Sequence, residues 1–392
     1  MKKKLLLIIF ILFLSFPSQV FGNVSNHDEI QFIYINGSNN NDKKMKDWFF
    51  KGMHKMHPFM VKAINSSDFM NENFLENGKY IVSEKPEAFF WGDKSQDEIQ
   101  TINSDLSITK MFSPKLAQTV RTLIAHYLHD AIWVSRYRNM HPILQDLHKQ
   151  VMHNYQNNKQ VVLFGYSAGA FVTYEYLFNK LPDIDVYDYF SRTNVSDEFK
   201  EFVKNNKMKP TCIDALIASK LAVYSADDRL IPNFNTEQSK KDYLKLNEYT
   251  CTECIPNGTL KGIVNFASPL VLFYSDISNA NYPLTYYNKL LYKYLLENDM
   301  FWLTVNYADD PLGYPTTKNI SYKDLKDKIN LQINPAKGFL YSKSDVNSRR
   351  TFIGAHTSYW STSKRFSKSV VQAYEDGFCL YNSENCKKED NN

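Results

Sequence analysis

The sequence predicts an α/β fold in which helices cover both faces of a mainly parallel sheet. Two observations lead to this prediction. Short apolar runs of strand length alternate almost throughout with longer segments whose apolar residues recur at three- and four-residue steps, as in helices. The chain is also long and apolar enough to build such a core, with 392 residues that are 43% hydrophobic and 15% aromatic.

Five apolar runs are predicted to be strands, because each is closed by residues that are typical of turns. They are 30–37 (IQFIYING), 88–93 (AFFWGD), 161–164 (VVLF), 262–270 (GIVNFASPL) and 301–307 (FWLTVNY). Strands that alternate with helices in this way indicate a parallel sheet, whose crossover connections place helices on both of its faces.

Helical periodicity is found in most of the connections between these strands. Helices are predicted over 44–64, about 115–155, 168–181 and 283–298, and in an amphipathic segment that ends at Gly377. Pro142 is expected to divide the second of these into two helices, because a proline removes a backbone hydrogen bond from a helix interior.

Residues 182–258 differ from the rest of the chain. They are polar and rich in Lys and Asn, and they contain one apolar segment, CIDALIASKLAVYSA. We expect them to form a cap-like insertion over the core of a single domain that spans 23–392.

The first 22 residues have the pattern of a secretory signal peptide. Three lysines at 2–4 precede an apolar stretch over 5–16 that is too short to cross a bilayer comfortably, and Pro17 ends this stretch. Small or compact residues near Gly22 suit a signal peptidase. We therefore expect residues 1–22 to be removed and the protein to be periplasmic or secreted; an uncleaved anchor is the alternative.

The charge of the chain argues against a nucleic-acid partner. Residues 1–22 carry three lysines and no acid, so their removal lowers the formal charge from +4 to +1. Binding to phosphate backbones needs a clustered excess of Lys and Arg. No second apolar run approaches membrane-spanning length, so contact with a membrane is expected only through a substrate.

Five cysteines follow the signal segment: Cys212, Cys251, Cys254, Cys379 and Cys386. Export permits disulfides, and the short spacings favour the local pairs Cys251–Cys254 and Cys379–Cys386, which leaves Cys212 unpaired. A redox pair or a zinc site is disfavoured, because CTEC follows a polar segment and the second pair is widely spaced.

The stretch 161–177 (VVLFGYSAGAFVTYEYL) joins an apolar strand to a helical pattern through GYSAG at 165–169. Such a G-x-S-x-G turn between a strand and a helix predicts a nucleophile elbow, in which Ser167 projects from the sheet. The glycines permit close packing of chain on chain, and the Ala168 N–H at the helix start can face a developing oxyanion.

A serine hydroxyl needs a base to become a nucleophile, and the elbow requires the chain order Ser, acid, His. Eight of the nine histidines precede Ser167 and therefore do not fit this order: His27, His54, His57, His126, His129, His141, His148 and His153. The remaining one, His356, stands in IGAHTSYW, which we expect to be a loop just before a helix. His356 is therefore the predicted base.

Two pairs of aspartates follow Ser167 at the ends of apolar segments. NYADDPLGYP contains Asp309 and Asp310, and VYSADDRLIP contains Asp228 as its second aspartate. The later pair is preferred, because the strand 262–270 must lie between the elbow and the acid. Asp310 is the predicted acid, with Asp309 and Asp228 as alternatives.

The second donor of an oxyanion hole is expected from the loop after an early strand. In FIYINGSNN, Gly37 permits the turn, and the backbone N–H of Ser38 or Gly37 can face the site. An ordinary turn is the alternative, since Asn-Gly is a common turn pair.

The elbow GYSAG, the strand turn NFASP, the acid loop DDPLGYP and HTSYW, in this order, resemble an α/β-hydrolase of the lipase and esterase kind. The resemblance covers about residues 30–380 but leaves 182–258 without a counterpart. It implies Ser167 as nucleophile, Asp310 as orienting acid and His356 as base. Many lipases have His where this chain has Tyr166, so a triglyceride substrate is not implied.

Taken together, these features predict an exported serine hydrolase that cleaves a small-molecule or lipid carboxylic ester without a cofactor. Histidines at helical spacing, such as His54 with His57, have a spacing that metal ligands can have, but no metal site is predicted because no H-E-x-x-H occurs. A serine peptidase or an acyltransferase uses the same triad, and an inactive hydrolase fold used for binding is a third possibility. No oligomeric state is predicted.

Overall fold

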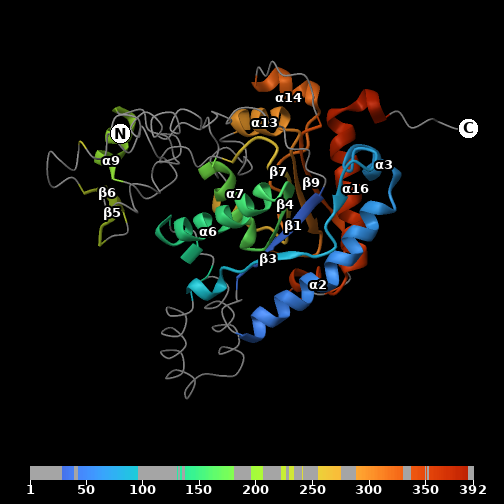
Figure 1. Ribbon diagram of the computed structural model, residues 1–392, viewed down its shortest axis with the longest axis horizontal. Coiled ribbons are helices and arrows are strands. Elements are labelled where there is room, and N and C mark those ends of the chain that lie inside the picture. The colour runs from blue at the N-terminus through green and yellow to red at the C-terminus, as the bar shows by residue number, and fades with distance from the viewer. Residues whose placement is uncertain are drawn as a thin grey trace, which may run out of the picture.

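The computed structural model describes residues 29–38, 43–95, 130, 133–134, 137–180, 196–205, 222–226, 229–233, 241, 255–274, 288–329, 337–348, 350 and 353–386 (Figure 1). The proposed signal peptide at 1–22 lies outside these residues.

A seven-stranded sheet lies at the centre of the described structure, and each of its pairings is parallel. Its strands are β1 (Glu29–Ile35), β2 (Ile81–Val82), β3 (Glu87–Phe89), β4 (Lys159–Tyr166), β7 (Leu260–Phe266), β8 (Phe301–Tyr307) and β9 (Phe339–Val346). Their order across the sheet is β2-β1-β4-β7-β8-β9, and β3 also pairs with β1. The central strands β4 and β7 are buried along almost their whole length, as expected for a sheet covered on both faces.

Helices cover both faces of this sheet. The longer ones are α2 (Lys43–Asn65), α6 (Tyr137–Gln156), α7 (Gly169–Lys180), α13 (Asn288–Glu297), α14 (Tyr322–Ile329) and α16 (Ser363–Tyr381), and the shorter ones are α3 (Asp68–Asn73), η1 (Gly92–Ser95), α12 (Leu270–Tyr274), α15 (Ile353–Thr357) and η3 (Ser383–Cys386). Helices α6 and α7 pack together beside β4, whereas α2 and α16 pack together on the other side (Figure 1). The chain therefore has the predicted α/β fold. None of the described helices is long and apolar enough to cross a bilayer.

Several local features differ from the sequence predictions. The edge strand β9 was not predicted, because its sequence FLYSKSDV is half polar. Helix α6 continues through Pro142, the sixth of its 20 residues, so this proline does not divide the helix as expected. Helix α16 does not stop at Gly377 but continues to Tyr381. A Cβ at Gly377 would lie 2.6 Å from the Phe339 ring, so this glycine allows the helix to pack closely on β9.

The described parts of 182–258 form a small unit beside the main sheet. Helix α9 (Asp197–Asn205) packs against a two-stranded antiparallel sheet made of β5 (Ala222–Tyr224) and β6 (Leu230–Pro232) (Figure 1). Lys180, before this segment, and Ile255, near its end, lie side by side, because the Ile255 N–H donates to the Lys180 carbonyl at 3.2 Å. The two ends of this segment therefore meet at one point of the core.

The last helical turns are tied together by a disulfide between Cys379 and Cys386. This pair was predicted from its spacing. The other predicted pair, Cys251–Cys254, and the odd Cys212 lie outside the described residues.

Candidate active site

Ser167 lies in a strained turn at the carboxyl end of β4. The strand ends at Tyr166 and α7 begins at Gly169, which leaves Ser167 and Ala168 to make the whole connection. Ser167 has a φ of 52°, in the left-handed region that non-glycine residues seldom adopt. Its N–H donates to the Phe266 carbonyl of the neighbouring strand at 2.9 Å, which fixes the turn to the sheet.

The two glycines of GYSAG are needed where the backbones approach most closely. A Cβ at Gly169 would lie 2.7 Å from the Ile35 carbonyl oxygen, at the end of β1. A Cβ at Gly165 would lie 2.9 Å from the Gly169 carbonyl oxygen and would collide with the Asn265 side chain. Any larger residue would therefore push α7 away from the sheet, and the position of Ser167 with it.

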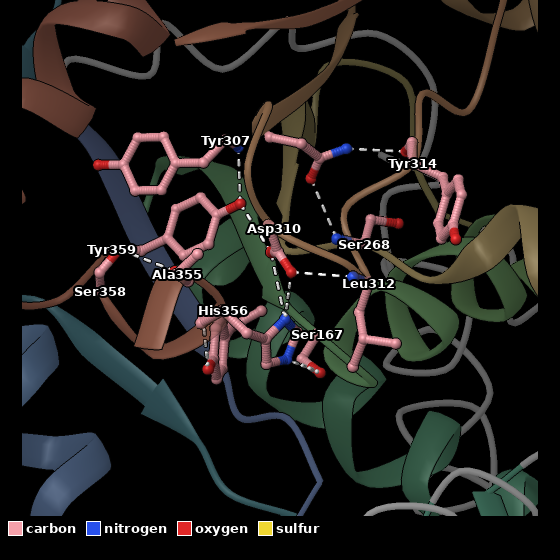
Figure 2. A network of polar contacts seen from close by, with 12 residues as sticks. Ser167, Ser268, Tyr307, Asp310, Leu312, Tyr314, Ala355, His356, Ser358 and Tyr359 are labelled. Atoms are coloured by element: carbon pink, nitrogen blue, oxygen red, sulfur yellow. Dashed lines mark hydrogen bonds and ion pairs between the residues drawn. The ribbon is translucent and has the colours of Figure 1, made fainter. Parts of the chain in front are cut away.

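Hydrogen bonds connect the three side chains that the sequence singled out, as Figure 2 shows. His356 Nε2 lies 3.0 Å from Ser167 Oγ, and His356 Nδ1 lies 3.0 and 3.2 Å from the two carboxylate oxygens of Asp310. Because an ionised carboxylate only accepts, Nδ1 carries the proton in the neutral ring and Nε2 is free to accept from Ser167. This tautomer is the one that a general base requires.

The Asp310 carboxylate is held by two further donors. The Leu312 N–H donates to Oδ1 and the Tyr359 hydroxyl donates to Oδ2, each at 2.9 Å (Figure 2). The Tyr307 N–H in turn donates to the Tyr359 oxygen at 2.8 Å. Burial, together with the nearby charge of Asp310, raises the pKa of Tyr359 well above its usual value, so its phenol stays protonated and donates.

The loop that carries Asp310 is anchored to the end of β7. Asn306 Oδ1 accepts from the Ser268 N–H at 3.1 Å, and Asn306 Nδ2 donates to the Tyr314 carbonyl at 2.8 Å. The Tyr314 N–H returns a bond to the Ser268 carbonyl at 3.0 Å. These bonds set the height of Asp310 above the sheet. Asn306 and Tyr359 both stand in segments that the sequence singled out, NYADDPLGYP and HTSYW, but sequence reasoning assigned a role to neither.

His356 lies within the short helix α15, not in the loop that the sequence predicted. Its carbonyl accepts from the Tyr166 hydroxyl at 3.1 Å, and the two rings lie 5.6 Å apart between centroids. Tyr166, next to Ser167 in the elbow, therefore positions the backbone of the histidine. A His at this position would be too short to make the same contact.

The alternative acids are placed differently. Asp309 turns away from His356 and accepts from Ser348, from its N–H at 2.8 Å and its hydroxyl at 2.7 Å. Burial tends to raise the pKa of Asp309, but the hydrogen bonds from Ser348 outweigh it, and this pKa lies below its usual value. Asp309 thus orders the loop that follows β9. Asp228 lies outside the described residues.

The turn after β1 lies directly against Ser167. A Cβ at Gly37 would lie 2.7 Å from the Ser167 Cβ, so glycine is needed for this approach. Ser38 follows and is 9% exposed, and Ala168 at the start of α7 is 1% exposed. The predicted oxyanion donors, Ala168 and Ser38 or Gly37, are therefore on the two backbone segments that flank Ser167.

Asn36 fixes this turn through hydrogen bonds to Trp91 and to Gly37. Its Oδ1 accepts from the Trp91 N–H at 2.8 Å, its carbonyl accepts from the Trp91 indole at 2.7 Å, and its Nδ2 donates to the Gly37 carbonyl at 2.9 Å. Asn36 is fully buried. The sequence suggested only an Asn-Gly turn here, because the partner Trp91 is distant in the chain.

The residues of the site are almost closed to solvent: the exposed fraction is 5% for Ser167, 2% for His356 and 5% for Asp310. No group of three or more metal-ligating side chains is found within the described residues. No family model, curated protein or solved structure matches this chain. The geometry of the site is thus the basis on which a function can be proposed.

Proposed function

We propose that this protein is a serine hydrolase of the α/β-hydrolase type that cleaves carboxylic esters. The observation that carries the proposal is the hydrogen-bonded chain from Ser167 through His356 to Asp310. A nucleophile, a base and an orienting acid in this arrangement are what acyl transfer requires. The order of the three residues along the chain is that of α/β-hydrolases.

The fold context supports this proposal. Ser167 connects a central parallel strand to a helix, and the acid and the base follow it after β8 and β9. In open α/β sheets, ligands bind at the carboxyl ends of the strands, which is where these side chains lie. A left-handed serine between close-packed glycines is the backbone geometry of a nucleophile elbow.

The proposed reaction has two stages. His356 Nε2 takes the proton of Ser167 as Oγ attacks the ester carbonyl, and Asp310 stabilises the resulting imidazolium. Backbone N–H groups of Ala168 and Ser38 or Gly37 stabilise the oxyanion, which collapses as His356 protonates the departing alcohol. Water, deprotonated by His356, then attacks the acyl-enzyme and releases the acid and Ser167. No cofactor takes part in these steps.

Labelling with a fluorophosphonate probe tests this proposal, because the probe reacts only with an activated serine. We expect the wild-type chain to be labelled, and we expect neither Ser167→Ala nor His356→Ala to be labelled. Ser268→Ala is a matched control, since Ser268 is also buried beside the site. A folded wild type that stays unlabelled would overturn the proposal in favour of an inactive binding protein.

A substrate panel then decides between ester, peptide and acyl-transfer chemistry. We expect release of 4-nitrophenol from short-chain 4-nitrophenyl esters, and no cleavage of peptide anilides. A faster reaction with an added alcohol than with water would indicate an acyltransferase.

We also propose that the protein is exported and loses residues 1–22. The lysines and the apolar run at the N-terminus support this, as does the disulfide between Cys379 and Cys386, since disulfides persist in oxidising compartments. The mass of the protein recovered outside the cytoplasm tests it, with a new N-terminus near Asn23 as the expected result. A full-length chain retained in the membrane would indicate an uncleaved anchor.

A further inference from the structure

A basic groove lies where α2, β9 and the start of α16 meet, and its volume is about 1040 Å³. Six of its described lining residues are cationic: Lys55, Lys343, Arg350, Lys364, Arg365 and Lys368. No Asp or Glu is found among these lining residues. The formal charge of the whole 392-residue chain is only +4, so this concentration of positive charge is a local feature.

Most of these cations form no ion pair with a carboxylate of the described residues. Lys343 pairs with Asp376 at 2.9 Å. Arg365 donates to a neutral group, the Asn347 carbonyl, at 2.7 Å. Lys55 likewise donates to the Ser361 carbonyl at 3.3 Å.

The other three cations, Arg350, Lys364 and Lys368, form no ion pair with any residue that the structure describes. The positive charges around the groove repel each other, and a bound anion offsets this repulsion.

The start of α16 lies at the same groove. Ser361, Thr362 and Ser363 line it, and Thr362 precedes the 19-residue helix. The Thr362 hydroxyl does not cap the helix but donates to the Ser358 carbonyl at 2.7 Å. The positive end of the helix dipole therefore adds to the charge of the side chains, and both favour an anion.

We propose that this groove binds a phosphate ester. A phosphate group has three strong acceptor oxygens and a charge between about −1.5 and −2 as a monoester, which suits several Lys and Arg donors better than a single carboxylate does. Phe59, which also lines the groove and is 36% exposed, offers an apolar surface to the organic part of the ester. The ester is either a soluble metabolite or the headgroup of an anionic phospholipid.

The groove is separate from the candidate active site. Ser167, His356 and Asp310 do not line it. Ser348 connects the two regions, because it lines the groove and donates to Asp309, the neighbour of Asp310. The proposal does not depend on the proposed hydrolase function, since binding can be measured without any turnover.

Calorimetric titration of the full chain with inorganic pyrophosphate tests the shared phosphate chemistry. We expect saturable binding that weakens at least tenfold in the triple variant Arg350→Gln/Lys364→Gln/Lys368→Gln. The matched control is Lys318→Gln/Lys323→Gln/Lys326→Gln, which removes the same charge from exposed residues in and before α14. We expect the control to bind within twofold of the wild type. Absence of saturable binding, or an equal loss in both variants, would overturn the proposal.

Vesicles distinguish the two sources of the phosphate. Binding to phosphatidylglycerol/phosphatidylcholine vesicles that exceeds binding to pure phosphatidylcholine, and that is lost in the groove variant alone, would assign a lipid headgroup. Pyrophosphate binding without this vesicle preference would assign a soluble ester. The wild type and all variants are compared in the same form of the chain, so any membrane affinity that arises outside the groove cancels. Tighter binding to a single-stranded 20-mer DNA than to pyrophosphate, lost in the same variant, would overturn the proposal in favour of nucleic acid.

A second measurement on the wild type does not require the variant to fold. We expect saturating pyrophosphate to protect Lys364 and Lys368 from acetylation, as read by mass spectrometry, and to leave Lys323 and Lys326 unprotected. Equal acetylation of all four with and without pyrophosphate would contradict the proposed site.

Discussion

Two neighbouring strands of this sheet end in the same backbone conformation but in different surroundings. The ends of β4 and β7 are paired at Tyr166 and Phe266, and the next residues, Ser167 and Ala267, have φ values of 52° and 53°. Both are buried non-glycine residues in a left-handed turn, which costs about 1–2 kcal/mol each.

The difference lies in what each turn presents to the site. After β4, the serine itself occupies the strained position, and its hydroxyl meets His356 at 3.0 Å. After β7, the strained residue is an alanine, and the buried hydroxyl of Ser268 that follows has no hydrogen-bond partner within the described structure. A strained turn at a strand end is thus not sufficient for an active site, because a base must also be brought to it.

The largest expected effect separates the two serines at these turns. We expect Ser167→Ala to lower ester hydrolysis by on the order of 10⁴-fold or more, because it removes the proposed nucleophile. Ser268→Ala should stay within about twofold of the wild-type rate. Steady-state kinetics with a 4-nitrophenyl ester measures both variants, and equal losses would show that the two turns do not differ in function.

The second-largest effect is expected when Asp310 is changed. Asp310 supports the base His356, which is present at the β4 turn. We expect Asp310→Asn to lower kcat by about 10³- to 10⁴-fold, because an amide does not hold the Nδ1 proton of His356 as a carboxylate does. Asp309→Asn is the matched control and should change kcat by less than about threefold, since Asp309 contacts Ser348 instead. A larger loss in Asp309→Asn than in Asp310→Asn would reassign the acid.

Asp309 should instead affect stability, and in a pH-dependent way. The pKa of Asp309 is lower in the folded protein than in the unfolded chain. Its ionised carboxylate therefore contributes to the free energy of unfolding at pH values above the unfolded pKa of about 3.9, and this contribution is lost as the pH falls through the folded pKa. We expect Asp309→Asn to lower the free energy of unfolding by about 1–2 kcal/mol at pH 7 and by less below pH 4. Denaturant unfolding at both pH values measures this effect. A difference in the free energy of unfolding between wild type and Asp309→Asn that is larger in acid than at pH 7 would contradict it.

The smallest effect concerns the strain in the β7 turn. We expect Ala267→Gly to change the free energy of unfolding by less than about 1 kcal/mol, because relief of strain is offset by the lost methyl group and by a freer unfolded chain. Ala267→Val should destabilise by more than about 2 kcal/mol, since a β-branched residue is strongly disfavoured at positive φ. Hydrolysis by the glycine variant should be unchanged. Equal stability of the Gly and Val variants would mean that the backbone of the turn changes conformation to accept valine, and would contradict this prediction.

Much of the site could be predicted from local sequence. The elbow is a contiguous pattern, so an apolar strand, GYSAG and a helical run were enough to single out Ser167. His356 could be predicted because it alone among the histidines follows Ser167. The choice of Asp310 over Asp309 was a preference only, because two adjacent residues share one sequence context.

Other features were not predictable, because their partners are distant in the chain. Asn36 is held by Trp91, and Tyr359 binds Asp310, at separations that no local pattern reports. Strand β9 is half polar, since it pairs with β8 at the edge of the sheet. Gly377 was expected to end a helix, but its missing side chain instead makes room for Phe339.

The sequence by itself thus determined the α/β class, the order of most strands and helices, and the strained serine, because each depends on contacts between near neighbours in the chain. Only the tertiary structure decided which carboxylate meets His356, which tyrosine supports that carboxylate, and which lysines and arginines gather in one groove. These depend on how separate strands and helices are packed, since hydrogen bonds and charges act over a few ångströms of space regardless of distance along the chain.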